Sequence, residues 1–446
     1  MTSLPTARVP LAATRLAPLA PAPVTRLAFN RFAFLFSFAI LLNGYASGVP
    51  GLSLGSVVYV VLILAAFFAT LASHGSVPWI VVLVPFAALF LTMLSGVVVA
   101  NPWFSWSATV FALAKLFTLV GVAALVGARW FDLATVNHWL WRFAALMTGY
   151  LYLQTLLFAF GFVLPNLITL GPLHPYASGY AEVPIYLGGM LRPAGMLSEP
   201  AFYASFLSLA ITTYFERWFN DFSLRRLLVL AFFSVGVILS TSTSGILALP
   251  IIWLVYLARM RLRGFAVAAG LLAFALAFLR FGAVSLGTVL SSNLWQVTIF
   301  KLTNLDTSAR VGISYQALGW LTPRERLVGV GWGNAPQLVL ARSTDPNPST
   351  YVNSAVSLIV ETGYIGLGVF VALMALLLIR CIQAGSMLAV LLLAQYLAGG
   401  TGSGMYFSTF GVLYMTYIFY LSRRPQDSQH EGDTYDTPPP EHHHSD

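Results

Sequence analysis

Two arginines lie where a cation could bind an anion at a membrane surface. Arg192 is part of "MLRPAGMLSEPAFYASF", and Arg310 is part of "TSARVGISYQAL". Each is next to the expected start of a helix or an apolar segment, at the depth of lipid head groups. A guanidinium is costly there unless an anion meets it. Because the guanidinium offers phosphate a fixed fork of donors, two of them facing one pocket suit a diphosphate. The pattern therefore indicates a lipid-linked diphosphate as ligand.

Further cations surround Arg310 in a long segment, residues 283–352. The segment holds more basic than acidic residues. Short loops with many cations usually lie in the cytoplasm, but long loops do not follow this rule. The cations of this segment are therefore compatible with an outer location, although the rule does not explain them. We interpret four arginines in or next to the segment as candidate substrate contacts, with solvated loop charge as the alternative for the last three: Arg280, Arg324, Arg326 and Arg342.

Glu199 is the candidate general base. It follows Arg192 near the expected start of a helix, where a partly desolvated carboxylate would take a proton from an acceptor hydroxyl. An acidic residue at a helix start also complements the helix dipole and needs no catalytic role. His174 and Tyr203 are further candidate substrate contacts, whereas Glu361 is assigned no role.

Several missing motifs narrow the chemistry. The chain has no glycine-rich phosphate loop, no HExxH, no CxxC and no DxD-type paired carboxylates. We therefore expect no metal site and no cofactor, so that arginines would have to stabilise a departing diphosphate themselves. The histidines at positions 442–444 are interpreted as adventitious metal ligands at most.

These residues lie in a chain with the composition of a membrane protein. Of its 446 residues, 58% are hydrophobic and 9% are charged, and the mean hydropathy is +0.80. The net charge of +8 comes from cations clustered at the ends of apolar runs, which sets membrane topology and does not indicate nucleic acid. The composition predicts an all-α, polytopic integral membrane protein.

About twelve apolar runs are candidate transmembrane helices, since a helix needs about 20 apolar residues to cross the bilayer core. Basic residues follow the even-numbered runs, which predicts that both termini are cytoplasmic. The runs are 28–44, 51–73, 77–99, 105–127, 139–164, 198–215, 227–240, 245–258, 264–283, 353–379, 384–399 and 403–421.

The same pattern divides the chain into three parts. Residues 1–27 are predicted to form a disordered cytoplasmic arm, residues 28–421 the transmembrane domain, and residues 422–446 a disordered cytoplasmic tail. Two outer loops, 165–198 and 283–352, are longer than connectors need to be, and we expect the second to be partly helical. Residues 240–245, "STSTSG", form either a hairpin turn or the floor of a polar cavity.

Three stretches resemble the bacterial O-antigen polymerase and O-antigen ligase superfamily, particularly its exopolysaccharide polymerase branch. "RPAGMLSEPAFYASF" is similar to the family's pattern after the smaller periplasmic loop, and "ARVGISYQALGWLTPRERLVGVGWGN" is similar to the larger loop. "VNSAVSLIVETGYIGL" is similar to the helix entry that closes that loop. The stretches lie within residues 190–370, while the apolar layout fits over the whole length.

The resemblance implies an inner-membrane glycosyltransferase that acts, without a metal, on undecaprenyl-diphosphate-linked glycans at the periplasmic face. It implies that Arg192 and Arg310 bind the diphosphate and that Asn353 is the helix-entry asparagine. It also implies a glycine turn whose backbone can approach a substrate, with an ordinary turn as the alternative. The glycines concerned are Gly329, Gly331 and Gly333.

Val352 departs from the family's ligases, which typically have a histidine directly before that asparagine. The departure favours a polymerase that moves a glycan from its lipid diphosphate onto a sugar hydroxyl of the next lipid-linked repeat unit. The alternatives are a ligase that transfers glycan to the lipid A core and a transporter or flippase of lipid-linked oligosaccharides. The chain shows no internal repeat of the transporter kind. The expected partners are the lipid-linked donor and acceptor, membrane lipids and a chain-length regulator.

Overall fold

The computed structural model describes residues 26–47, 53–72, 87, 89–90, 92–93, 103–127, 131–166, 185–186, 190–221, 223–259, 309–344, 352–402, 406 and 408–422. These residues are mostly helical, as predicted. An antiparallel pair of two-residue strands, β1 (Ile185–Tyr186) and β2 (Met190–Leu191), leads into Arg192.

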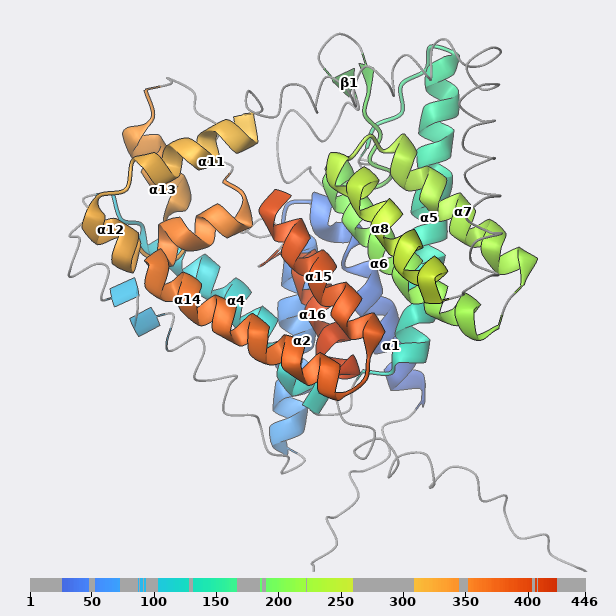
Figure 1. Ribbon diagram of the computed structural model, residues 1–446, viewed down its shortest axis with the longest axis horizontal. Helices are drawn as coiled ribbons and strands as arrows, with labels where there is room; N and C mark the ends of the chain where they lie inside the picture. The colour runs from blue at the N-terminus through green and yellow to red at the C-terminus, as the bar shows by residue number, and fades with distance from the viewer. Residues whose placement is uncertain are drawn as a thin grey trace, which may run out of the picture.

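The helices follow the predicted apolar runs closely (Figure 1). Two runs, 77–99 and 264–283, lie mostly or wholly outside the described residues. The bundle helices are α1 (Arg26–Phe38), α2 (Leu54–Ala72), α4 (Trp106–Gly127), α5 (Leu133–Ala159), α6 (Pro200–Asn220), α7 (Leu224–Leu239), α8 (Thr243–Arg259), α14 (Ser354–Gln383), α15 (Met387–Gly402) and α16 (Thr409–Leu421). A short 3-10 helix, η1 (Leu41–Gly44), follows α1, and the larger loop contains α11 (Ala309–Gly319), α12 (Pro323–Val328) and α13 (Ala335–Arg342).

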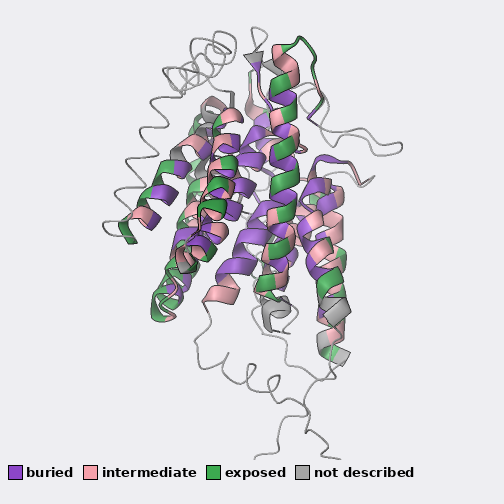
Figure 2. Ribbon diagram, turned by 90° about the vertical axis from the view of Figure 1, so that its right-hand side faces the viewer, coloured by how far each residue is buried: buried purple, intermediate pink, exposed green. Residues whose placement is uncertain are grey.

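Helix α14 is long and apolar enough to cross a membrane. Within the described part of the chain it alone meets both conditions, so twelve spans remain a prediction. Its outward face carries large apolar side chains such as Val369 and Leu376, which are 52% and 59% exposed. Figure 2 shows exposed positions along the outer sides of the other helices as well.

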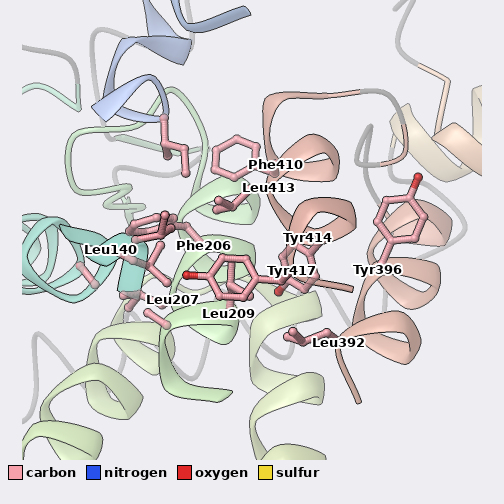
Figure 3. Close-up of a cluster of buried hydrophobic side chains, with 14 of the residues drawn as sticks. Leu140, Phe206, Leu207, Leu209, Leu392, Tyr396, Phe410, Leu413, Tyr414 and Tyr417 are labelled. Carbon is pink, nitrogen blue, oxygen red and sulfur yellow. The ribbon is translucent and has the colours of Figure 1, made fainter. Parts of the chain in front are cut away.

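Helix α16 lies at the centre of the core. Every residue from 409 to 418 is buried, as expected for a helix that is apolar on all faces. Its tyrosine hydroxyls are satisfied inside the protein: Tyr414 donates to the Ser205 carbonyl (2.9 Å) and Tyr417 to Asn137 Oδ1 (2.7 Å). Figure 3 shows these rings among side chains of α5, α6 and α15. The helices on either side of the smaller loop, α5 and α6, therefore contact α16.

Helix α14 is broken near its start by Gly363. This glycine has φ 65° and ψ −170°, values outside the helical region, so the helix consists of two parts. The break frees the carbonyls of Val360 and Glu361, which accept the backbone N–H groups of Val330 (2.9 Å) and Gly331 (3.0 Å). Residues 364–383 form the long apolar part, which is sufficient for the roughly 30 Å hydrocarbon core. The first part, residues 354–362, belongs with the larger loop.

Ser240, Thr241 and Ser242 of the "STSTSG" stretch form the turn between α7 and α8, and the other three residues begin α8. Ser240, Thr241 and Ser242 are all buried, and Thr241 has a positive φ of 54°. The hydroxyl of Ser240 donates to the Val237 carbonyl at 2.7 Å. The hairpin interpretation is therefore confirmed, and the turn lies inside the protein.

Candidate functional site

The segment that carries Arg192 is fixed to helix α5. The side-chain oxygen of Asn166 accepts the Ala194 N–H (2.9 Å), and that of Gln154 accepts the Gly195 N–H (3.2 Å). Gly195 has φ 61°, and a Cβ there would lie 3.0 Å from the Met147 carbonyl of α5. Arg192 is thus a half-buried residue in an otherwise buried stretch, and its Nε atom is buried. These hydrogen bonds hold the backbone that follows Arg192 against the end of α5.

Glu199 lies at the N-cap position of α6, directly before Pro200, as the sequence predicted. One of its carboxylate oxygens is buried, so it is partly desolvated. Tyr203 lies one turn later, fully buried, and its hydroxyl donates to Thr148 of α5 at 3.1 Å. Tyr203 therefore joins two bundle helices, and its predicted contact with substrate would require a different partner for this hydroxyl.

Arg310 lies in the first turn of α11, and its side chain lies outside what the structure describes. One turn later, the buried hydroxyl of Ser314 accepts the backbone N–H of Asn353 at 3.2 Å. Asn353 in turn caps α14, since its Oδ1 accepts the Val356 N–H at 2.9 Å. The backbone at position 310 is thus tied to the start of α14. Arg280 and His174 lie outside the described residues.

The two arginine-bearing segments lie toward the same side of the molecule. In Figure 1, β1 of the smaller loop and α11 and α13 of the larger loop are all found in the upper half. The convergence of Arg192 and Arg310 on one ligand stays a prediction.

The glycine turn packs against the protein's own backbone. Gly329, Gly331 and Gly333 have φ values of 78°, 99° and 81°. A Cβ at Gly329 would lie 2.2 Å from the Glu361 carbonyl oxygen, and one at Gly331 would lie 2.6 Å from the Phe104 ring. The approach of this backbone to a substrate stays a prediction, because α14 and the segment before α4 occupy the space over Gly329 and Gly331.

Asn334 fixes the end of this turn to α4. It is fully buried, its amide donates to Thr109 Oγ1 (3.1 Å), and its side-chain oxygen accepts the Ser105 N–H (2.7 Å). No local sequence pattern marks Asn334, because its partners lie more than two hundred positions away in the chain. The turn is therefore held between α4 and α14.

Two charged residues within apolar helices also lie here. The Glu361 carboxylate accepts the Ser357 hydroxyl (2.9 Å) and the backbone N–H groups of Gly333 and Ala335. Lys115 of α4 is close enough to interact electrostatically with Glu361. Their position in the sequence could have identified both residues, because a charged residue inside an apolar run usually has a function or a partner. Glu361 locks the glycine turn onto the broken start of α14.

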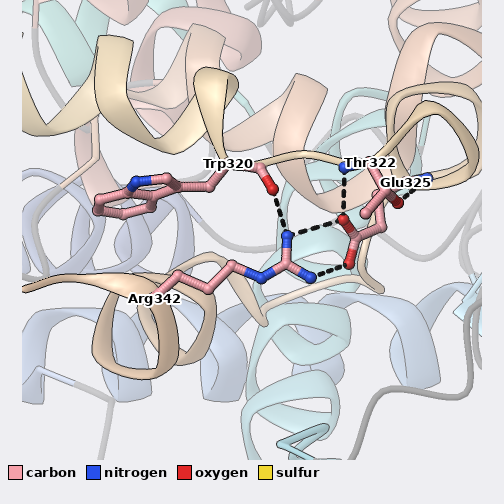
Figure 4. Close-up of polar contacts among 4 residues, drawn as sticks. All are labelled: Trp320, Thr322, Glu325 and Arg342. Carbon is pink, nitrogen blue, oxygen red and sulfur yellow. Dashed lines mark hydrogen bonds and ion pairs between the residues drawn. The ribbon is translucent and has the colours of Figure 1, made fainter.

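Arg342 binds within the larger loop (Figure 4). Its two terminal nitrogens donate to the two oxygens of Glu325 at 2.7 and 2.8 Å, and it also donates to the Trp320 carbonyl. Glu325 is 1% exposed and completes a capping box with Thr322, whose N–H donates to it at 2.7 Å. The alternative of a freely solvated loop charge is therefore wrong for Arg342, while its contact with substrate stays a prediction. Its guanidinium is already engaged, which leaves little of it to meet a substrate.

Arg324 and Arg326 differ from Arg342 in their exposure. Both lie on α12, and both are exposed, in keeping with solvated loop charge. They serve as matched controls for Arg342, because they carry the same charge in the same loop.

Replacing Arg342 with alanine is expected to destabilise the larger loop. The change leaves Glu325 buried without its cation, and breaking such a pair costs about 3 kcal/mol. The measurement is the rate of proteolysis within residues 309–344 of the purified protein, together with its thermal unfolding. Arg326→Ala should change the unfolding free energy by less than about 0.5 kcal/mol. Equal behaviour of the two variants would contradict this assignment.

The loop is also expected to loosen in acid. Burial raises the pKa of Glu325, but the hydrogen bonds from Arg342 and Thr322 outweigh it and hold the pKa below its ordinary value of 4.5. A pKa lowered in the folded state stabilises the loop above the unfolded value, and the contribution is lost as pH falls through the folded value. Proteolysis of the loop by pepsin should therefore accelerate as the pH falls below the ordinary carboxyl value of 4.5. In the Glu325→Gln variant, the rate of proteolysis of the loop should not show this dependence on pH.

Comparison with known proteins adds no relative: neither a scan against models of protein families nor a search of curated proteins found a match. Among the residues that the structure describes, no group of three or more His, Cys, Asp or Glu side chains could hold a metal ion. The chemical character of the site therefore rests on Arg192, Glu199 and the loop that carries Arg310.

Proposed function

We propose that this protein is a polymerase of bacterial surface polysaccharide. In this proposal, it transfers a glycan from undecaprenyl diphosphate onto a sugar hydroxyl of the next lipid-linked repeat unit. The observation that carries the proposal is the anchoring of both arginine-bearing segments: one is fixed on α5, and the other is tied to the broken start of α14. Such rigid backbones suit cations that must hold one leaving group.

The proposed location is the bacterial inner membrane, with about twelve spans and the site facing the periplasm. Support comes from α14 and from the apolar side chains that many helices expose outward. Those side chains are expected to face lipid, because a water-soluble protein rarely exposes apolar patches of this extent.

The proposed reaction is a direct displacement at the anomeric carbon. The acceptor hydroxyl forms the new carbon–oxygen bond while the bond to the diphosphate breaks, with inversion at that carbon. Arg192 and Arg310 stabilise the negative charge that builds on the leaving diphosphate. Glu199 takes the hydroxyl proton, for which a partly desolvated carboxylate at the edge of the loop is suited.

The test is polymerisation by the purified protein without any nucleotide. The protein is placed in lipid nanodiscs with a lipid-linked repeat unit, and the products are separated on a gel. We expect a ladder of glycan lengths that is unchanged in EDTA, because arginines rather than a metal ion neutralise the diphosphate. Absence of a ladder, or a ladder lost in EDTA and restored by magnesium, would contradict the proposal.

One observation favours a second candidate, a transporter of lipid-linked oligosaccharides. Helix α14 is discontinuous at Gly363, and transporters often build their sites from broken helices. Here the glycine turn fills the break. Its backbone N–H groups donate hydrogen bonds to the carbonyls that the break leaves free. The two candidates are separated by the same nanodisc experiment, since a transporter forms no new glycosidic bond.

A further inference from the structure

Two exposed arginines, Arg142 and Arg217, lie near the ends of α5 and α6 that are remote from the smaller loop. Arg142 is near the start of α5, and Arg217 is in the last turn of α6. His138, one turn before Arg142, is also exposed and lies close enough to both guanidinium groups to interact electrostatically with them. The two cations, which belong to different helices, therefore share one region of the surface.

Each of these guanidinium groups lies over a tryptophan ring. The Cζ atom of Arg142 is 5.1 Å from the ring centroid of Trp139. The Cζ atom of Arg217 is 5.2 Å from the ring centroid of Trp141, whose Nε1 donates to Thr213 Oγ1 of α6 at 3.1 Å. A guanidinium is attracted to the face of a tryptophan ring, and this stacking leaves the N–H groups at its edge able to donate. The two arginines are therefore oriented but can still bind an anion.

The carboxylates next to Arg217 in the chain have other cations as partners. Glu216 binds Arg259, with 3.1 Å between its Oε2 and a terminal nitrogen of the arginine. Asp221 binds Arg226 in the same way. Among the residues that the structure describes, neither of the two stacked arginines forms an ion pair. This region of the surface therefore carries an excess of positive charge.

Beyond Arg142, toward the smaller loop, the same face of α5 becomes apolar. Residues spaced three or four positions apart lie on one face of a helix. This face continues with Leu146, Leu153 and Leu156, which are 51%, 44% and 50% exposed. Between them, a Cβ at Gly149 would meet no neighbouring atom within 4 Å, so the surface is open there. A basic end followed by an open apolar stripe matches the order of head group and acyl chain in a phospholipid.

We propose that this surface binds one anionic phospholipid, with its phosphate held by Arg142 and Arg217 and an acyl chain along the exposed leucines of α5. The proposal rests on the membrane location proposed above, but it requires neither the diphosphate site nor glycan transfer. Guanidinium groups bind phosphate through charge-assisted hydrogen bonds, and basic pockets between membrane helices bind anionic head groups. A zwitterionic phospholipid should bind more weakly, because its own cation offsets the charge of its phosphate.

The test is a titration of the full chain, washed free of lipid in dodecyl maltoside, with phosphatidylglycerol, with phosphatidylcholine of the same acyl chains, and with water-soluble glycerol 3-phosphate. The readout is the shift of the thermal unfolding midpoint. We expect saturable stabilisation by phosphatidylglycerol but not by phosphatidylcholine, which lacks the net charge, or by glycerol 3-phosphate, which lacks the acyl chains. Equal stabilisation by the two lipids, or by glycerol 3-phosphate at the same concentration, would overturn the proposal.

Variants of the two arginines decide the assignment. Arg142→Gln and Arg217→Gln should each raise the apparent dissociation constant for phosphatidylglycerol about tenfold or more, since each loses charge-assisted hydrogen bonds. The matched control is Arg380→Gln, which removes an exposed cation from the last turn of α14 and should leave the constant unchanged. If Arg217→Gln unfolds, Arg142→Gln still tests the site.

An unchanged dissociation constant in Arg142→Gln, or an equal increase in Arg380→Gln, would overturn the phospholipid site. Either result leaves the polymerase proposal standing, because the ladder of glycan lengths is measured separately. A full chain that stays folded and dissolved without detergent would instead contradict the membrane location on which both proposals rest.

Discussion

Alanine at Arg192 or at Arg310 is expected to lower the rate of glycan transfer about a hundredfold, a loss of roughly 3 kcal/mol of transition-state stabilisation. Each guanidinium would form charge-assisted hydrogen bonds that strengthen as negative charge builds on the leaving diphosphate. The loss should therefore fall on the maximal rate more than on KM. Lysine should restore only part of the rate, because a point charge does not reproduce a two-pronged contact. The measurement is the initial rate of polymerisation by reconstituted variants.

The controls for this prediction come from the same loop. Arg324→Ala and Arg326→Ala each remove one exposed positive charge from α12 and should retain most of the rate. Arg342 is not a suitable control, because its loss would leave the buried Glu325 without a partner. Near-normal polymerisation by folded, membrane-inserted Arg192→Ala and Arg310→Ala proteins would show that these cations are ordinary loop charges.

Alanine at Gly363 is expected to detach the larger loop from α14. A Cβ at this position would lie 2.3 Å from the Leu327 carbonyl oxygen and 2.6 Å from the Gly329 nitrogen, and the residue has φ 65°. The positive φ costs about 1 kcal/mol or more for alanine, and the overpacking adds about 1–3 kcal/mol. The hydrogen bonds to Val360 and Glu361 would be lost with the contact. We expect destabilisation by about 3 kcal/mol, measured by thermal unfolding and by proteolysis of residues 309–344.

Gly368 provides a matched control on the same helix. A Cβ at Gly368 would meet no neighbouring atom within 4 Å, and the residue has no positive φ, so Gly368→Ala should be neutral or slightly stabilising. If Gly363→Ala and Gly368→Ala unfold at the same temperature and resist protease equally, the break in α14 does not hold the loop.

The helical layout was predictable because long apolar runs are a strong signal. The break in α14 was not predictable from the sequence. Gly363 lies in "ETGYIGLGVF", and nothing in this stretch distinguishes it from the other glycines of an apolar helix. Its backbone conformation depends on the contact with Leu327, which belongs to a different helix, α12. Contacts of this kind cannot be inferred from local pattern, which explains why α14 was predicted as one uninterrupted run.

The candidate site was only partly predictable for a similar reason. Glu199 could be placed at a helix start from the Glu-Pro pair alone, and the structure agrees. Arg342 and Arg326 look alike in sequence, yet only Arg342 reaches the buried Glu325. The "TPRE" stretch did contain a usable signal, because threonine followed three residues later by glutamate is typical of a capping box. It would have shown that Glu325 is structural, although not which arginine pairs with it.

The most direct test of the central claim is the transfer rate of the double variant Arg192→Ala, Arg310→Ala. If both guanidinium groups hold one diphosphate, they act as a unit, and effects of such groups are not additive. The double variant should then be little slower than the slower single variant, at about one hundredth of the wild-type rate. Losses that multiply to about ten-thousandfold would show that the arginines act independently, and would contradict a shared diphosphate.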